Sequence, residues 1–153
     1  MTDTAPPVGG RTIGLAHYAG RAVLERVLAR HGLTFQQQIT LRAAVAAVGP
    51  LESGALVEQV TDALKTGAAD VRTAVDTLLS EGLLAADGPL VRPTDAAREL
   101  FAVVSAETGE ISARIYAGIP PEDLATTGRV LARVTERADA ELANLAQPTR
   151  ASR

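Results

Sequence analysis

A mainly α-helical fold with one small β-hairpin is predicted by three observations, all within residues 54–94. Apolar residues recur at helical spacing in two consecutive stretches. Lys65-Thr66-Gly67 separates these stretches, and a polar run that contains glycine is typical of a helix break. Two short apolar runs then flank Asp87-Gly88, a strong signal for a two-residue hairpin turn. Helix, turn, helix and hairpin in this order predict a winged helix-turn-helix, a fold that usually binds DNA.

Both helices of this stretch have a single apolar face, which indicates that one side of each is buried. Their apolar positions are Leu56, Val57, Val60 and Leu64 in the first helix and Val71, Ala74, Val75, Leu78 and Leu79 in the second. Gly82 stands where a left-handed residue is expected to end the second helix.

Two helices are expected before the winged stretch. The first covers residues 12–31, and Gly32 is its candidate C-terminal cap. Thr34, with Gln37 three residues later, forms a capping-box signature for the second. Ser53 is a candidate N-cap for the helix that follows.

Two more helices are expected after the hairpin. Thr94 follows a proline and is predicted to cap the first of them. Gly118 and Pro120-Pro121 separate the two helices. Glu122-Asp123 then lies in the first turn of the last helix, where carboxylates interact favourably with the helix dipole.

The first helix and the last two carry apolar stripes that one small winged helix cannot cover, so a second copy of the chain is expected to complete their burial. The N-terminus is polar and rich in proline and glycine, which favours a disordered leader over a targeting signal. The predicted parts are a disordered leader (1–11), an N-terminal dimerisation helix (12–32), a winged helix-turn-helix (33–93), C-terminal dimerisation helices (94–146) and a disordered tail (147–153).

Composition excludes several function classes. The chain has no cysteine, which excludes disulfides, iron–sulfur clusters and thiolate catalysis. Its histidines, His17 and His31, lie about four helical turns apart, so we expect no metal site within one subunit. Because neither a serine-nucleophile elbow nor a phosphate-binding glycine loop occurs, we expect no enzyme activity and no cofactor.

The sequence contains no recognisable signal peptide or membrane-spanning segment, so we expect a cytoplasmic protein without a membrane partner. Lys65 is the only lysine, and alanine and arginine are abundant, a bias that is typical of high-GC bacteria.

The winged stretch is acidic, which weakens the case for DNA, because DNA binding draws much of its affinity from phosphate neutralisation. Its basic residues are Lys65, Arg72 and Arg92, and its acidic residues are Glu58, Asp62, Asp70, Asp76, Glu81 and Asp87.

From about Thr12 to Leu145, the sequence resembles the multiple-antibiotic-resistance regulator (MarR) family of bacterial transcription factors, of actinobacterial type. The segments that carry the resemblance are Leu33-Thr34-Phe35-Gln36-Gln37, the run from Val71 to Leu84 with its "L-x-x-x-G-L" exit, and Leu90-Val91-Arg92-Pro93-Thr94. Two departures are Ala97, where the family usually has glycine, and the wing tip. There, Ala85-Ala86-Asp87-Gly88-Pro89 replaces the family's Asp-x-Arg-x-x-Arg segment.

The resemblance implies a homodimer that is held by the first and the last two helices. It also implies that two winged helices bind one palindromic operator in double-stranded DNA. A ligand pocket is implied between the dimerisation helices and the DNA-binding part, as in a ligand-responsive repressor.

The residues expected to bind DNA lie mainly on the second helix of the winged stretch. Arg72 is the candidate for guanine recognition, while Thr73 and Thr77 are placed to reach phosphate or a thymine methyl group. The alternative is a solvated face with an Arg72–Asp76 pair within the helix. The full predicted set is Lys65, Ala68, Ala69, Arg72, Thr73, Thr77 and Arg92.

A small aromatic or anionic effector is the predicted ligand of a cluster near the N-terminus. His17, Tyr18 and Arg21 lie together on the first helix, and Phe35 would complete an aromatic wall beside a cation. The alternative for these residues is packing at the dimer interface and an ordinary polar surface.

Two functions remain open at this stage. One is a dimeric, ligand-responsive transcriptional regulator. The other is a winged-helix module that binds proteins and has weakened or lost DNA binding. The acidic winged stretch favours the second, and the resemblance over nearly the whole chain favours the first.

Overall fold

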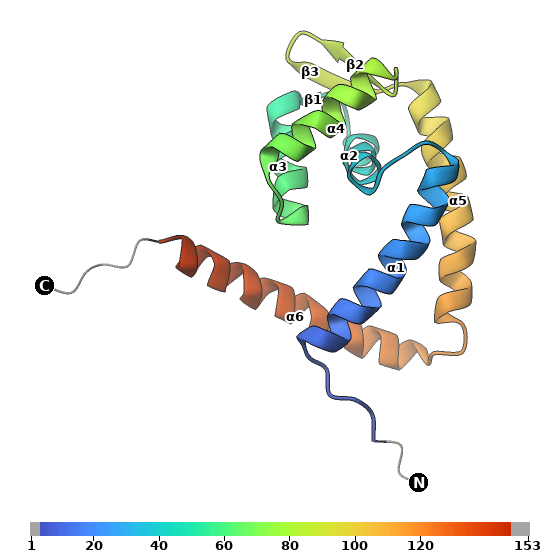
Figure 1. The fold of residues 1–153 in the computed structure, drawn as a ribbon, viewed down its shortest axis with the longest axis vertical. Helices are drawn as coiled ribbons and strands as arrows, with labels where there is room; N and C mark the ends of the chain where they lie inside the picture. Colours follow the sequence, from blue (N-terminus) through green and yellow to red (C-terminus); the bar gives the residue numbers. More distant parts are fainter. Residues whose placement is uncertain (1–3, 148–153) are drawn as a thin grey trace, which may run out of the picture. The chain divides into compact units, whose positions relative to one another are not determined.

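The computed structural model describes residues 4–147. These residues form six helices and one three-stranded antiparallel sheet, which confirms the predicted mainly helical winged-helix fold (Figure 1). The elements are α1 (Gly10–Arg30), α2 (Phe35–Ala46), β1 (Leu51–Glu52), α3 (Ser53–Leu64), α4 (Ala68–Ser80), β2 (Leu84–Asp87), β3 (Leu90–Pro93), α5 (Asp95–Tyr116) and α6 (Pro121–Ala146). The chain divides into two compact units, Met1–Ile111 and Ser112–Arg153, and the boundary falls within α5.

The caps of α1 and α2 follow the sequence signatures. Gly32 has a φ of 69°, and the N–H groups of Gly32 and Leu33 donate to Ala29 and Leu28 in a Schellman motif. At the start of α2, Thr34 Oγ1 accepts from the Gln37 N–H group, and Gln37 Oε1 accepts from the Thr34 N–H group.

The two ends of the chain differ in part from expectation. The helix α1 begins at Gly10, so the last two residues of the predicted leader are helical. Gln147 caps α6, while residues 1–3 of the leader and residues 148–153 of the predicted tail lie outside the described residues.

The start of α3 corrects one prediction. Ser53 is not the N-cap, because it is already the first residue of α3, and Glu52 precedes it without a side-chain cap. The reason is a short strand that the sequence does not reveal: Leu51 pairs with Val91 of β3, and the Ser53 N–H group donates to the Pro89 carbonyl. A two-residue strand is too short to show an alternating pattern.

The hairpin turn is displaced by one residue from its predicted place. Asp87 belongs to β2 and pairs with Leu90, so Gly88-Pro89 forms the two-residue turn. Gly88 has a φ of 56° at the first central position, as a type II′ turn requires. Pro89 has no N–H group to donate, so the turn suits it better than a paired strand does.

Thr94 joins the end of α4 to the start of α5. Its hydroxyl donates to the Gly82 carbonyl over 2.8 Å, and its oxygen accepts from the Ala97 N–H group at 3.2 Å, as predicted for an N-cap. Its own N–H group donates to Leu83. Gly82, with a φ of 72°, ends α4 in the left-handed conformation that its position predicts.

The core of the first unit lies around α2, which contacts α1, α3, α4 and β3 (Figure 1). Each fully buried leucine or valine in this core stabilises the fold by about 1.5–3 kcal/mol. The largest such side chains are Leu28, Leu41, Leu56, Leu78, Leu84, Val27, Val60, Val71 and Val104.

An ionic cluster of Arg30, His31 and Glu107 connects the end of α1 to α5. The Glu107 carboxylate pairs with Arg30 and accepts a hydrogen bond from His31 Nε2 over 2.9 Å. The hydrogen bond from His31 is the largest influence on the pKa of Glu107 and lowers it. Burial opposes this effect by raising the pKa, and the positive charge of Arg30 lowers it further, so the net shift is downward.

In the second unit, α6 has no buried residue, although its sequence is strongly amphipathic. Exposed apolar side chains lie at Val130, Leu131, Val134, Leu142 and Leu145. Across residues 4–147, every helix is too short or too polar to span a bilayer.

The Glu107 cluster predicts a pH-dependent contribution to stability. Since its pKa is lower in the folded than in the unfolded protein, the contribution is fully present above the ordinary glutamate value of 4.5 and is lost as pH falls through the lowered value. Glu107→Gln should therefore be less stable than the parent at pH 7, and the difference should shrink below pH 4.5.

Urea unfolding across this pH range measures the difference. Glu110→Gln, at an exposed position on the same helix, is the matched control and should leave the pH profile unchanged. A Glu107→Gln deficit of equal size at every pH would contradict this account of the cluster.

Candidate nucleic-acid interface

The helix α4 has one buried and one exposed face. Val71, Ala74, Val75 and Leu78 are buried, which turns the opposite side of the helix to solvent. The predicted DNA-binding residues Ala69, Arg72 and Thr73 are exposed on that side, together with Asp76. Ala68 and Thr77 are only half-exposed, and Ala68 packs against the core.

The two threonines of this face have their hydroxyl protons engaged within the helix. Thr73 Oγ1 donates to the Ala69 carbonyl over 3.1 Å, and Thr77 Oγ1 donates to the Thr73 carbonyl over 2.9 Å. Phosphate contact through either proton would require these bonds to break. The methyl groups suit apolar contact with thymine better.

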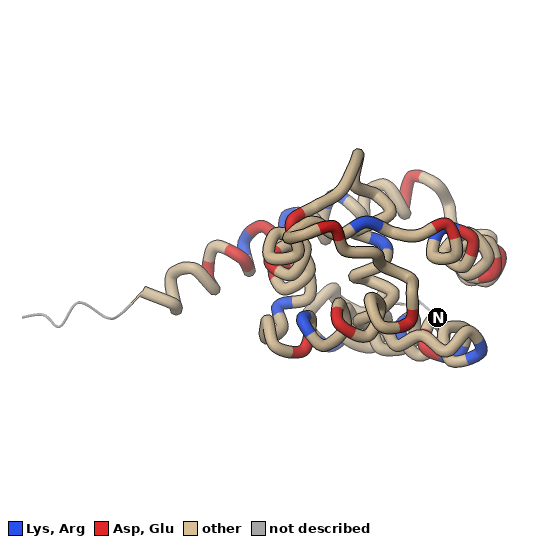
Figure 2. The backbone as a smooth tube through the Cα atoms, turned by 90° about the horizontal axis from the view of Figure 1, so that it is seen from above, with Lys and Arg blue, Asp and Glu red and all other residues tan. Residues whose placement is uncertain are grey.

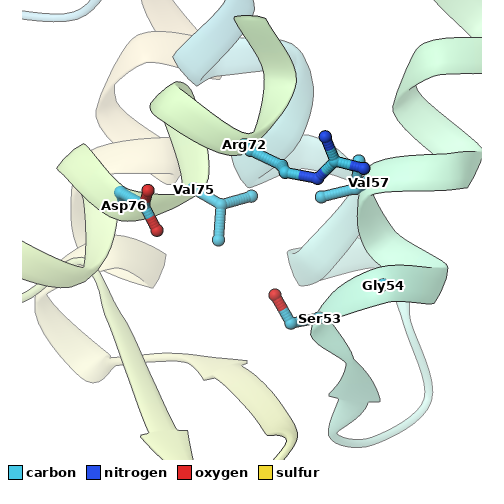
Figure 3. A pocket seen from close by; sticks show the side chains of 6 residues that line it. All are labelled: Ser53, Gly54, Val57, Arg72, Val75 and Asp76. Carbon is cyan, nitrogen blue, oxygen red and sulfur yellow. The ribbon is translucent and has the colours of Figure 1, made fainter. Parts of the chain in front are cut away.

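An open pocket of about 210 Å³ lies where this face of α4 meets the start of α3. Figure 3 shows Arg72, Val75 and Asp76 on α4 and Ser53, Gly54 and Val57 on α3 around it. The sequence did not indicate the contribution of α3, because the signals at Ser53 and Val57 concern the helix start and its apolar face and not an approach to Arg72.

Arg72 and Asp76 do not pair with each other. No ion pair joins them within residues 4–147, and Figure 3 shows their charged groups pointing in different directions. The intrahelical pair considered as the alternative for this face is therefore absent there, and both side chains are exposed.

The wing and the α3–α4 turn supply the other predicted cations. Arg92 is exposed on β3 opposite Ala85, while the tip from Asp87 to Pro89 has no basic residue. Lys65 is exposed at the C-cap of α3 with a φ of 52°. Acidic and basic residues are interspersed along the backbone, as Figure 2 shows.

The predicted effector residues form two separate contacts. The guanidinium of Arg21 lies over the Phe35 ring, 4.2 Å from its centroid, and Arg21 Nε pairs with Glu25 at 2.9 Å. His17 and Tyr18 meet edge to face, with ring centroids 5.7 Å apart. Glu25 was not among the predicted residues, although its i,i+4 spacing from Arg21 indicates such a pair.

Neither His17 nor His31 belongs to a metal-binding cluster in the part of the chain that the structure describes. Residues 4–147 contain no group of three or more His, Asp or Glu side chains that could hold a metal ion. His31 instead contacts Glu107, as described above.

The fold is that of MarR-like winged-helix proteins, as solved structures show. One is a MarR-family transcriptional regulator from Rhodococcus sp. RHA1, with a TM-score of 0.69 and 18% identity over 82% of this chain and 90% of that one. Another is MarR from Staphylococcus aureus in complex with salicylate and kanamycin, with a TM-score of 0.73 and 15% identity over 86% and 90%.

A third similar structure is a MarR-family protein from Mycobacterium tuberculosis in complex with DNA. It has a TM-score of 0.66 and 17% identity, and covers 84% of this chain and 98% of that one. No protein-family model and no curated protein matches the sequence. At these identities the likeness establishes the fold and leaves function to be argued from the residues.

Proposed function

We propose that this chain is a cytoplasmic, non-enzymatic transcriptional regulator that binds duplex DNA as a homodimer. The observation that carries the proposal is the exposed face of α4, which presents Arg72 without an ion-pair partner in residues 4–147. A helix that exposes an arginine in this way can donate two hydrogen bonds to a guanine in the major groove. The MarR-like fold, which a DNA complex also adopts, supports this role for α4.

In this proposal, each half of a palindromic operator meets one copy of α4. The two helices must then be spaced by about 34 Å, one turn of DNA, or a multiple of it. An effector that changes this spacing would weaken binding through a population shift, so the protein would act as a ligand-responsive repressor.

The charge of the winged stretch favours a second candidate function, a winged-helix module that binds another protein. Residues 54–94 contain six acidic residues, from Glu58 to Asp87, and only three basic ones, Lys65, Arg72 and Arg92. With so few cations, each subunit would neutralise few phosphates, and the salt dependence of DNA binding should be shallow for a dimer of this fold. A protein that retards no duplex at low salt would be this module instead.

The direct test is retardation of a palindromic site in the DNA upstream of the protein's own gene. Arg72→Ala should cost about 1–3 kcal/mol per half-site and relax the base preference there, if Arg72 binds guanine through two hydrogen bonds. Arg92→Ala should weaken all sequences alike, as expected for a phosphate contact. Unchanged operator affinity in Arg72→Ala would show that α4 is not the reading helix.

Dimerisation is predicted to use the apolar stripe of α6. Leu131 and Leu142 are 36% and 51% exposed in the single chain, and we expect a second copy of the chain to cover them. Replacing both with Glu should dissociate the dimer, because charges would enter a dry interface. Ala140→Glu, on the opposite side of α6, is the matched control and should remain dimeric. A parent protein that sediments as a folded monomer at micromolar concentration would refute the prediction.

Effector binding is predicted to involve Arg21. A small aromatic anion such as salicylate should raise the melting temperature, since a ligand at 100 times its Kd stabilises the folded state by about 2.7 kcal/mol. Arg21→Ala should lose most of this rise, because it removes the cation over Phe35. Arg26→Ala, at another exposed position of α1, should retain it. An equal rise in both variants would exclude Arg21 from the effector site.

A further inference from the structure

We infer that Asp76 reads a cytosine in the operator, beside the guanine that Arg72 would bind. The inference rests on the proposed function and adds to it the identity of one further base in each half-site. It gives a role to the carboxylate of α4 that lines the same pocket as Arg72.

The position of Asp76 supports a contact with a base edge. Arg72 and Asp76 are both exposed, and both line the pocket between α4 and the start of α3. They are one helical turn apart, about 6 Å along the helix axis. Successive base pairs are about 3.4 Å apart on each strand, so the two side chains would address bases one or two pairs apart.

The carboxylate oxygens of Asp76 are available to accept hydrogen bonds from DNA. Within residues 4–147 it joins no ion pair and accepts no side-chain hydrogen bond. The neighbouring hydroxyl protons of Thr73 and Thr77 are donated to carbonyl oxygens of α4. Figure 3 shows the carboxylate directed away from the Arg72 guanidinium, so the two groups can meet different bases.

Cytosine is the base that fits an unpaired carboxylate. An ionised carboxylate only accepts hydrogen bonds, and cytosine presents its amino donor in the major groove. Guanine and thymine present acceptors there, and adenine places the N7 acceptor beside its amino group. Opposite guanine or thymine, Asp76 would add an unfavourable contact to its repulsion from the phosphates, and opposite adenine the N7 acceptor would offset the contact with the amino group. The carboxylate would therefore lower general affinity for DNA while selecting cytosine.

The test is selection of bound duplexes from a random pool by the parent protein and three variants. The parent should enrich a cytosine one or two pairs from the guanine whose enrichment Arg72→Ala removes. Asp76→Asn should exchange that cytosine for adenine, because asparagine pairs with the N6 and N7 edge of adenine. Replacing the cytosine should weaken binding of the parent about fivefold or more and should matter less to Asp76→Asn.

Asp70→Asn is the matched control. Asp70 is an exposed acidic residue of α4 outside the pocket lining, and its replacement removes the same charge. It should strengthen binding to all duplexes alike and leave the enriched sequence unchanged. Since both carboxylates are exposed, neither substitution removes a buried contact.

The outcomes separate this inference from the function on which it rests. If the parent enriches a sequence and Asp76→Asn enriches the same one, the cytosine contact is overturned. The DNA-binding proposal would still stand. Failure of the parent to enrich any duplex at low salt would overturn both.

Discussion

The burial of one face of α4 is the constraint on which the rest of the structure depends. Val71, Val75 and Leu78 are each at most 2% exposed, and each contributes about 1.5–3 kcal/mol of burial free energy. Rotating the helix about its axis would expose these side chains, so the orientation of α4 is fixed by the core. The same constraint determines that Arg72 and Asp76 face outward beside α3. Thr94 and Gly82 then fix where α4 ends relative to α5.

This arrangement limits how the protein would bind DNA. The wing tip offers no cation, and the threonine hydroxyl protons of α4 are already donated within the helix. In the proposed function, most discrimination would then come from Arg72 and Asp76, and phosphate contacts would contribute less. An acidic winged stretch is consistent with such a balance, because it weakens general affinity for DNA more than it weakens base-specific contacts.

Local signals in the sequence predicted the fold well, and contacts between distant segments were harder to predict. Thr34 with Gln37, Gly32, Gly82 and Thr94 mark helix ends through bonds within a few residues of themselves, so the sequence locates them. Ser53 was misassigned because β1 pairs with a strand almost forty residues later in the chain. The turn at Gly88-Pro89 was displaced by one residue because Asp-Gly is the stronger general signal. The pocket could not be predicted, because it forms only where α3 packs beside α4. No local pattern indicates which residues of α3 approach Arg72.

The central claim is that α4, and not the wing, would contact the bases. Its most direct test is an NMR titration of the labelled protein with a duplex that it binds, monitoring the backbone amides and the arginine Nε–H groups. The account predicts that signals from Ala69 to Thr77 and the Arg72 Nε–H signal change on binding, while those of the turn at Gly88 do not. Changes confined to the wing or to α1, with α4 unaffected, would contradict it.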